Sequence, residues 1–476
     1  MTSVTGRTPV TAEQGDKRHS LVLTAIVFFT LLIGLDSSIV NVALPKLQEP
    51  LGFSTTGLSW VLNAYTLAFG GLLLLGGRLG DILGRRRVYV AGILLFTLAS
   101  LLAGLAQSDW WLVAARSGQG VGAALAAPSS MALIMTNFEG VARARAIAWF
   151  SAMMLAGGSL GLVVGGLVTE WISWRWVLLV NVPLGLISAF LAGRYIQQPP
   201  RQPGRFDIPG AATATLGMVA LVYAFLSAPS RGWGDVVTLT SFALAVVLLA
   251  AFVAIETRAA QPIAPLYVLT SGGRVWLFTI MAFITAASFS VIFLLTQFNQ
   301  EVLGFSPLAA GCAILPMTVA QFGFVKLVPQ LMPKVGAMRL LVAGAIASTA
   351  GLLWLSMLSA DSDFLSGELV PLALIGLGGG LVFPALNMTI MSGVAPTEAG
   401  ATSGLLQTTQ WLGGTLGLAI FVTVLGSVSG DSASGAQLAD GVSAGFLAAM
   451  ISASCGLLLA IGFTLSRRAR KEPAAA

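Results

Sequence analysis

The sequence predicts an all-α polytopic membrane protein with 14 transmembrane helices, arranged as two six-helix pseudo-symmetric bundles plus two inserted central helices. Composition is the first observation behind this prediction: 56% of the residues are hydrophobic, only 9% are charged, and the mean hydropathy is +0.88. These values lie far outside the range of a soluble globular domain. The second observation is an internal repeat that relates the two halves of the chain.

The repeat appears in two registers. The segment Leu51–Ser54 returns 252 positions later as Leu303–Ser306, and the same offset carries Gly84 onto Gly336. A second offset of 256 relates Gly120 to Gly376, Gly122 to Gly378, Pro128 to Pro384, Gly157 to Gly413, Gly158 to Gly414 and Gly161 to Gly417. Duplicated halves in an apolar chain are typical of secondary transporters, which bind substrate at the interface between the halves.

Segments of about 20 apolar residues are long enough to cross ~30 Å of hydrocarbon as helices. We predict such spans near residues 21–45, 57–77, 87–107, 111–135, 145–169, 175–195, 208–227, 237–257, 275–298, 307–328, 338–358, 369–392, 402–427 and 443–465. The predicted organisation is a tail at 1–19, an N-terminal bundle at 20–196, a linker with helices 7 and 8 at 197–273, a C-terminal bundle at 274–466 and a tail at 467–476.

The charge distribution orients these spans. With the amino terminus in the cytoplasm, 21 of the 25 Lys and Arg residues fall on the inner side, as the positive-inside rule requires. Both termini are then cytoplasmic, and we expect a multi-pass protein of the cytoplasmic (inner) membrane. The net charge of +6 comes from short loops at helix ends, so it does not indicate a nucleic-acid partner.

Few residues are available for other chemistry. Cys312 and Cys455 both lie in apolar segments, which predicts neither a disulfide nor a metal site, and the only histidine, His19, lies in the tail. The chain has no Walker loop and no nucleophile with a base partner. We therefore expect no enzyme and no cofactor, with the proton gradient as the energy source.

Several motifs make the chain similar to the major facilitator superfamily, and more narrowly to its fourteen-helix drug:proton antiporter family. The motifs are Leu35–Pro45 in the first span, Gly77–Arg87 after the second, Arg116–Gly122 in the fourth, and Trp174–Trp176 with Asn181–Pro183 around the sixth. The resemblance covers nearly the whole chain, and the loop motif is the most specific of the set.

The loop motif suggests a gate. Gly77 and Gly84 permit a close approach and a tight turn. The resemblance implies that Asp81 meets a helix amino terminus in the other half, where an anion is favoured by ~0.3 to 1 kcal/mol. Arg85, Arg86 and Arg87 could instead serve only to set the topology. In the second half Pro333 takes the place of Asp81, so we expect the latch to be one-sided.

Asp36 is the only carboxylate that lies well inside a predicted span. A charge at this depth costs ~2.5 to 3.5 kcal/mol, and burial disfavours the ionised form, which makes Asp36 a candidate proton carrier. Arg116 is its natural partner because an arginine stays charged. The resemblance implies that Arg116 and Gln119 face the first span. A static buried ion pair is the alternative to a switch.

The fifth span carries Gly157, Gly161 and Gly165 at four-residue spacing, which allows close packing against another helix and could also serve gating. The family pattern has a proline after the middle glycine, where this chain has Leu162.

In the second half we expect no acid deep in a span. The candidate cavity groups there are neutral or aromatic, although each could instead be interhelical contact. They are Gln297, Gln321, Phe383, Asn387, Gln407, Gln410 and Trp411, and Gln119 adds to the cavity from the first half.

These features favour a monomeric, proton-coupled antiporter, surrounded by membrane lipid, that exports small amphipathic organic molecules across the cytoplasmic membrane by alternating access. Drugs, antiseptics or antibiotics are the expected substrates. A dedicated exporter or a proton-coupled importer of one metabolite is the alternative within transport. A membrane-embedded enzyme and a non-transporting sensor are the alternatives from other classes.

Overall fold

The computed structural model describes residues 12–53, 57–198, 207–259, 273–395, 398–430 and 435–469, and all regular structure in these ranges is helical. Thirteen helical segments in this part of the chain are long and apolar enough to cross a membrane. The remaining long helix, α4 (Asp109–Asn137), contains Arg116 and Gln119 and packs between α2 and α3. With α4 included, the predicted arrangement of fourteen spans is confirmed. Parts of both predicted tails and of the predicted linker lie outside the described residues.

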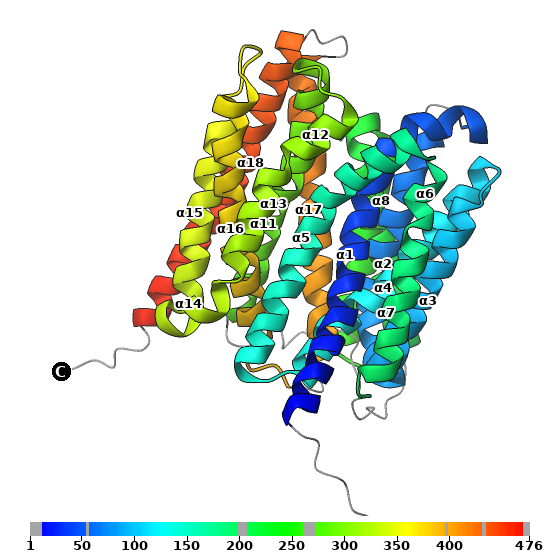
Figure 1. Ribbon diagram of the computed structural model, residues 1–476, viewed down its shortest axis with the longest axis vertical. Helices are drawn as coiled ribbons and strands as arrows, with labels where there is room; N and C mark the ends of the chain where they lie inside the picture. Colours follow the sequence, from blue (N-terminus) through cyan, green and yellow to red (C-terminus); the bar gives the residue numbers. More distant parts are fainter. Residues whose placement is uncertain are drawn as a thin grey trace, which may run out of the picture.

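The start of the first described helix and the end of the last one lie at the same end of the helical bundle, which we call the proximal end; the other is the distal end (Figure 1). The N-terminal bundle contains α1 (Ala12–Leu51), η1 (Gly57–Ser59), α2 (Trp60–Leu83), α3 (Arg85–Gly104), α4, α5 (Gly140–Trp171), α6 (Arg175–Leu179) and α7 (Asn181–Tyr195). The C-terminal bundle contains α11 (Arg274–Gln297), η3 (Phe298–Val302), α12 (Pro307–Ala313), α13 (Leu315–Val325), α14 (Val328–Val335), α15 (Ala337–Leu355), η4 (Leu365–Leu369), α16 (Val370–Met391), α17 (Ala399–Ser429) and α18 (Gly435–Ala469).

The repeated glycines occupy equivalent places in the two bundles. Gly84 ends α2 with φ 105°, and its mate Gly336 ends α14 with φ 90°, a backbone conformation that favours glycine. A Cβ added at Gly92 in α3 would lie 2.7 Å from a carbonyl oxygen of α4, and one at Gly344 in α15 would lie 2.8 Å from a carbonyl oxygen of α16. The sequence repeat is thus a structural repeat of close helix pairs.

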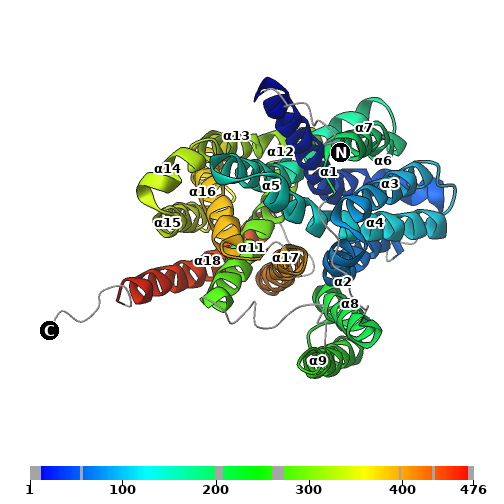
Figure 2. The ribbon, with the colours of Figure 1, turned by 90° about the horizontal axis from the view of Figure 1, so that it is seen from below.

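The two helices between the bundles are α8 (Ile208–Arg231) and α9 (Val236–Glu256). Seen from the proximal end, they lie beside α2 and α17 at the edge of the molecule, with α9 outermost (Figure 2). α8 packs on both α2 and α17, and Trp233, just after α8, donates its indole N–H to Thr423 Oγ1 of α17 at 2.9 Å. This helix pair therefore bridges the two bundles on one side.

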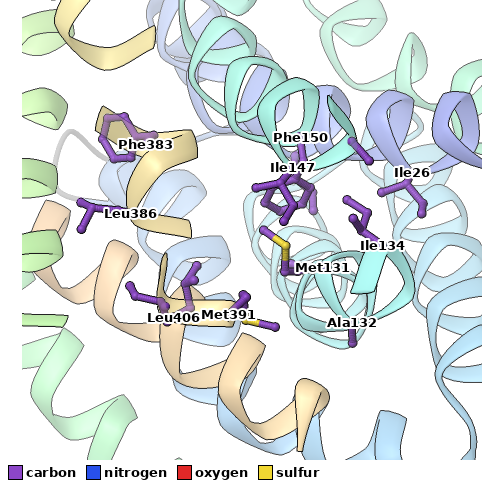
Figure 3. Packing of buried hydrophobic residues seen from close by; sticks show 14 of the residues in the cluster. Ile26, Met131, Ala132, Ile134, Ile147, Phe150, Phe383, Leu386, Met391 and Leu406 are labelled. Atoms are coloured by element: carbon purple, nitrogen blue, oxygen red, sulfur yellow. The ribbon is translucent and has the colours of Figure 1, made fainter. Parts of the chain in front are cut away.

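Apolar side chains from both bundles meet between them (Figure 3). Met131, Ile147 and Phe150 approach from α4 and α5, while Phe383 and Leu406 approach from α16 and α17, and all belong to one buried cluster. Apolar packing contacts therefore contribute to the interface between the bundles. Such contacts can break and re-form in another arrangement when the bundles move relative to each other.

Several boundaries differ from the predicted ones. α1 begins at Ala12, well before the predicted start near residue 21, and Arg18 Nε donates to the Tyr195 carbonyl oxygen at 3.2 Å, which ties the extension to α7. The predicted span 307–328 is divided into α12 and α13, a separate short helix, α14, begins at its last residue, and α13 and α14 each have a proline in their first turn. Proline lacks the N–H that would continue the preceding helix, so these divisions follow from the sequence locally.

Candidate functional site

Asp36 and Arg116 form a fully buried ion pair in the N-terminal bundle. Arg116 Nη1 of α4 lies 2.6 Å from Asp36 Oδ2 of α1, and the two side chains are 1% and 0% exposed. Two further donors reach the other carboxylate oxygen: Gln119 Nε2 at 3.1 Å and Asn181 Nδ2 at 2.8 Å. Three donors, one of them the arginine cation, satisfy the carboxylate in its ionised form.

Arg116 has partners besides Asp36. Its Nε donates to the Val61 carbonyl oxygen of α2 at 3.0 Å, and Nη1 also donates to Gln119 Oε1 at 2.8 Å. Its guanidinium carbon lies 4.6 Å from the centre of the Tyr65 ring, a cation–π distance. The guanidinium would therefore keep acceptors and an aromatic face if Asp36 became neutral.

Sequence reasoning did not assign roles to Asn181 or Ser100, although both belong to this network. Asn181 lies at the start of α7, and Ser100 Oγ of α3 accepts from Gln119 Nε2 at 2.7 Å. The sequence signal available was a polar side chain inside an apolar span. It does not say which helix the side chain faces, because that depends on how the helices pack.

A narrow cavity lies between the bundles, beside this network. Its N-terminal wall includes Gly34 and Ser37, which flank Asp36 on α1, together with Ser151 and Met154 of α5. The C-terminal wall includes the predicted cavity residues Phe383, Asn387, Gln410 and Trp411, and Phe289 of α11. The structure thus brings these four predicted residues together, one residue away from the ion pair.

Aromatic rings and amides line the cavity. Trp411 packs edge-on against Phe69 of α2 at 4.7 Å and against Phe289 at 5.6 Å between ring centres. Asn387 Nδ2 donates across the interface to Ser151 Oγ at 2.9 Å, while the Trp411 indole nitrogen has no hydrogen-bond partner. A few polar groups on an apolar wall are typical of a small-molecule site.

The cavity has a volume of only about 60 Å³, whereas sites for drug-sized ligands have volumes of roughly 300–1,000 Å³. The bundles must therefore move apart before such a ligand could enter.

Four of the predicted cavity residues do not line this cavity. Gln119 is committed to the Asp36 network. Gln297 lies at the distal end of α11. Gln321 of α13 is buried within the C-terminal bundle, where its backbone faces Gly380 of α16. Gln407 contacts the Ala127 carbonyl oxygen of α4 through Nε2 at 3.5 Å. Each of these residues lies on a helix face that is turned away from the cavity, and the sequence pattern did not show which face that is.

The loop motif joins the two bundles at the proximal end. Asp81 Oδ1 accepts from Arg85 Nε at 2.9 Å and Nη2 at 2.7 Å, while Oδ2 accepts from the backbone N–H of Ala401 at 3.2 Å. Ala401 lies in the first turn of α17, so the carboxylate meets a helix amino terminus in the other bundle. A Cβ at Gly77 would lie 2.7 Å from the Gly400 carbonyl oxygen, so this contact requires a glycine.

The neighbouring residues of this motif hold α3 in place. Gly84 forms the tight turn between α2 and α3. Arg86 Nη2 donates to the carbonyl oxygen of Gly193 in α7, within the same bundle.

The glycine stripe of α5 packs on α1. A Cβ at Gly161 would lie 2.6 Å from the Leu35 carbonyl oxygen, and one at Gly165 would lie 2.8 Å from that of Ile39; Gly157 makes the same kind of contact with Gly34. This places α5 directly against the helix turn that carries Asp36.

The opposite side of α5 contacts the C-terminal bundle. A Cβ at Gly166 would lie 3.2 Å from Leu308 Cα, and one at Gly311 would lie 3.2 Å from the Leu162 carbonyl carbon. Leu162, which replaces the family proline, thus lies at this contact, and α5 is helical throughout Gly140–Trp171. One helix touches both the Asp36 turn and the other bundle.

One buried acid of the second half, Glu368, was not considered as a buried group in the sequence analysis, which expected only that no acid lies deep in a span there. Glu368 of η4 is 0% exposed. It lies at the distal end of its span beside the acidic loop at 361–363, so the sequence pattern assigned it to the membrane surface. Among the residues that the structure describes, no group of three or more His, Cys, Asp or Glu side chains could hold a metal ion.

Two pseudo-symmetric helical bundles with a cavity between them, and a buried ion pair beside it, define a secondary transporter. The profile of the Major Facilitator Superfamily matches residues 26–418, and this chain belongs to that family.

Several relatives of this chain have names that describe export or drug resistance. The chain is 43% identical to the cephamycin export protein CmcT of Amycolatopsis lactamdurans, an alignment that covers 92% of this chain and 91% of that protein. It is 40% identical to the puromycin resistance protein pur8 of Streptomyces alboniger, over 89% and 84% of the two chains, and 34% identical to the multidrug resistance protein Stp of Mycobacterium tuberculosis, over 85% and 75%.

Solved structures share the fold. The proton:xylose symporter XylE superposes with a TM-score of 0.65 at 14% identity, covering 94% of this chain and 95% of that one. The human organic anion transporter MFSD10 (TETRAN) superposes with a TM-score of 0.63 at 15% identity, covering 95% and 100%.

Proposed function

We propose that this protein is a proton-coupled antiporter that exports amphipathic organic molecules, of the drug and antibiotic class, across the cytoplasmic membrane. The observation that carries the proposal is the buried Asp36–Arg116 pair, which lies one residue from the wall of an apolar cavity between the bundles. The names of the relatives, which include a cephamycin export protein and a puromycin resistance protein, support export rather than uptake.

The partners of Asp36 favour a switch over a static pair. Asn181 Oδ1 is buried and has no hydrogen-bond partner in this conformation. It is an acceptor beside the carboxyl group, available when Asp36 carries a proton. Since Arg116 also keeps Val61 and Gln119 as acceptors, both charge states of Asp36 can be satisfied without emptying the network.

This switch can reach the substrate through α1. Ser37 lines the cavity next to Asp36, and the same turn of α1 packs on the glycines of α5. A shift of α1 on protonation would therefore move α5, which also contacts the C-terminal bundle. Protonation and cavity opening become linked because each favours the same position of α1.

The cavity chemistry supports an amphipathic substrate. Phe289, Phe383 and Trp411 offer aromatic faces, while Asn387 and Gln410 offer hydrogen bonds without a charge. An organic molecule with a ring system and a few polar groups fits such walls better than a small ion does.

Charge supports an orientation with the proximal end in the cytoplasm. Arg85, Arg143 and Arg339 lie at proximal helix ends, while Asp109, Asp235 and Glu301 lie at distal ones. In this orientation the Asp81 contact closes the cytoplasmic side. We propose that a monomer in lipid carries out the cycle, because each chain contains both walls of the cavity.

Transport in inverted membrane vesicles with an imposed pH gradient tests the proposal. Fluorescent dyes, cephamycin-type β-lactams and puromycin are the substrates to compare, and vesicles from cells without the protein are the control. Gradient-driven uptake of at least one amphipathic compound is the expected result. A dedicated metabolite carrier would transport none of the panel, and a sensor or enzyme would give no gradient-dependent flux at all.

A further inference from the structure

A second fully buried carboxyl group lies in the C-terminal bundle, far from the Asp36 network along the chain. Glu368 and Asn299 are both 0% exposed, and Asn299 Nδ2 donates to Glu368 Oε2 at 3.1 Å. Each residue lies in a π-helical segment, Asn299 in η3 after α11 and Glu368 in η4 before α16. π-helical turns inside longer helices occur frequently at functional sites.

The surroundings of this pair are apolar. Leu295 and Leu303 lie one turn on either side of Asn299, Phe364 and Leu372 lie one turn on either side of Glu368, and all four belong to one apolar cluster. An ionised carboxylate in such surroundings is strongly disfavoured unless a cation or several donors stabilise it.

No cation reaches this pair among the described residues. The charged residues at the distal ends of the packed elements are acidic and exposed: Glu301 on η3, Asp363 before η4 and Asp440 on α18. The described cations of α11 and α15, Arg274 and Arg339, lie at the opposite, proximal ends. The local field therefore opposes a further negative charge.

Hydrogen-bond accounting points the same way. Glu368 Oε1 and Asn299 Oδ1 are buried and have no partner in this conformation. Both atoms are acceptors when the carboxyl is ionised, so neither can satisfy the other. A proton on Glu368 Oε1 turns that atom into a donor beside an unused acceptor, and the acid and the amide can then form a reciprocal pair.

The contrast with Asp36 is direct. Asp36 has three donors, one of which is an arginine, and these suit an anion, whereas Glu368 has one donor and no cation among the described residues. We propose that Glu368 is a second proton-binding site: it carries a proton in this conformation, and it releases that proton only when η3 and η4 separate and water reaches the distal end of the C-terminal bundle.

Infrared spectroscopy of the purified full-length protein in lipid nanodiscs tests the protonation state. At about pH 7, exposed carboxyl groups are ionised, so a carboxylic-acid C=O band reports a buried protonated acid. We expect Glu368→Gln to lose one such band and Asp36→Asn to keep it. Glu301→Gln, which removes an exposed acid two residues from Asn299, is the matched control and should leave the band unchanged. Identical spectra for wild type and Glu368→Gln would overturn the proposal.

Thermal stability against pH gives a second, independent readout. The folded chain retains the proton where the unfolded chain releases it, so the wild-type melting temperature should fall as the pH rises from about 5 to about 9. The amide of Glu368→Gln imitates the protonated acid, so this variant should match the wild type at low pH and vary less with pH. A variant that is unstable at every pH, or that keeps the wild-type pH dependence, would overturn the proposal. Neither readout uses transport, so the result is separate from the proposed export function.

Discussion

Neutralising Asp36 is the most informative perturbation of the proposed cycle. Asp36→Asn keeps the size of the side chain but replaces one acceptor oxygen with a donor, facing either Arg116 at 2.6 Å or the amides at 2.8 and 3.1 Å. It also leaves a buried cation without its counter-ion, which typically costs about 3–5 kcal/mol. Because Arg116 keeps Val61 and Gln119 as acceptors, we expect the free energy of unfolding to fall by about 3 kcal/mol.

The transport consequence is separate from the stability consequence. Each proton that moves down 100 mV contributes ~2.3 kcal/mol, which supports a substrate concentration ratio of about 50. Without a titrating group at position 36, we expect gradient-driven accumulation to fall to the equilibrium ratio of one. Exchange of labelled for unlabelled substrate should continue, because exchange needs no net proton movement.

Two measurements on the same preparation check this. Gradient-driven uptake and substrate exchange are compared in proteoliposomes, and melting temperatures are compared in detergent. Asp361→Asn, at an exposed position in the loop before η4, is the matched control for a lost negative charge. The double variant Asp36→Asn/Arg116→Gln should recover much of the stability but not the coupling. Full gradient-driven accumulation by Asp36→Asn would refute the reasoning and leave the pair as a static structural element.

Three further outcomes are expected. Asp81→Asn removes the negative charge at the amino terminus of α17 and should shift the conformational equilibrium toward opening at the proximal end by ~1 kcal/mol, about fivefold. A cysteine reporter near that end would detect this as greater accessibility. Unchanged accessibility together with lost transport would mean that Asp81 acts elsewhere. Gly161→Ala should destabilise the protein by about 1–3 kcal/mol because the added Cβ would meet α1. Gly193→Ala is the control and should not destabilise it, because no atom lies within 4 Å of a Cβ at that position. Equal melting temperatures of the two variants would contradict the close packing. A cysteine at Ser362, in a chain without its native cysteines, should react with an impermeant thiol reagent added outside intact cells, and its protection would reverse the proposed orientation.

Much of the site could be predicted because charge is scarce in this chain. One acid inside an apolar helix and one arginine in another are expensive enough in lipid that a pairing of Asp36 with Arg116 is the economical expectation. The contact of Asp81 with a helix amino terminus followed from a family resemblance, and Ala401 supplies it.

The differences between the expected and the observed positions of polar residues have a common cause. Gln297, Gln321 and Gln407 are polar residues in apolar helices just as Asn387 and Gln410 are, but only the last two face the cavity. A polar residue in a membrane helix must face protein, yet several neighbouring helices can satisfy it. Glu368 was missed for a related reason: its depth is that of a surface residue, and only packing of η3 against it removes the solvent.

The sequence by itself determined the membrane environment, the fourteen-helix plan, the duplication and the scarcity of charge, because these depend on composition and on periodicity along one chain. Only the tertiary structure decided which donors surround Asp36, which amides face the cavity, and that Glu368 pairs with Asn299. Those contacts join residues 69 to 236 positions apart, and they depend on the rotation of each helix about its axis, which close packing against its neighbours sets.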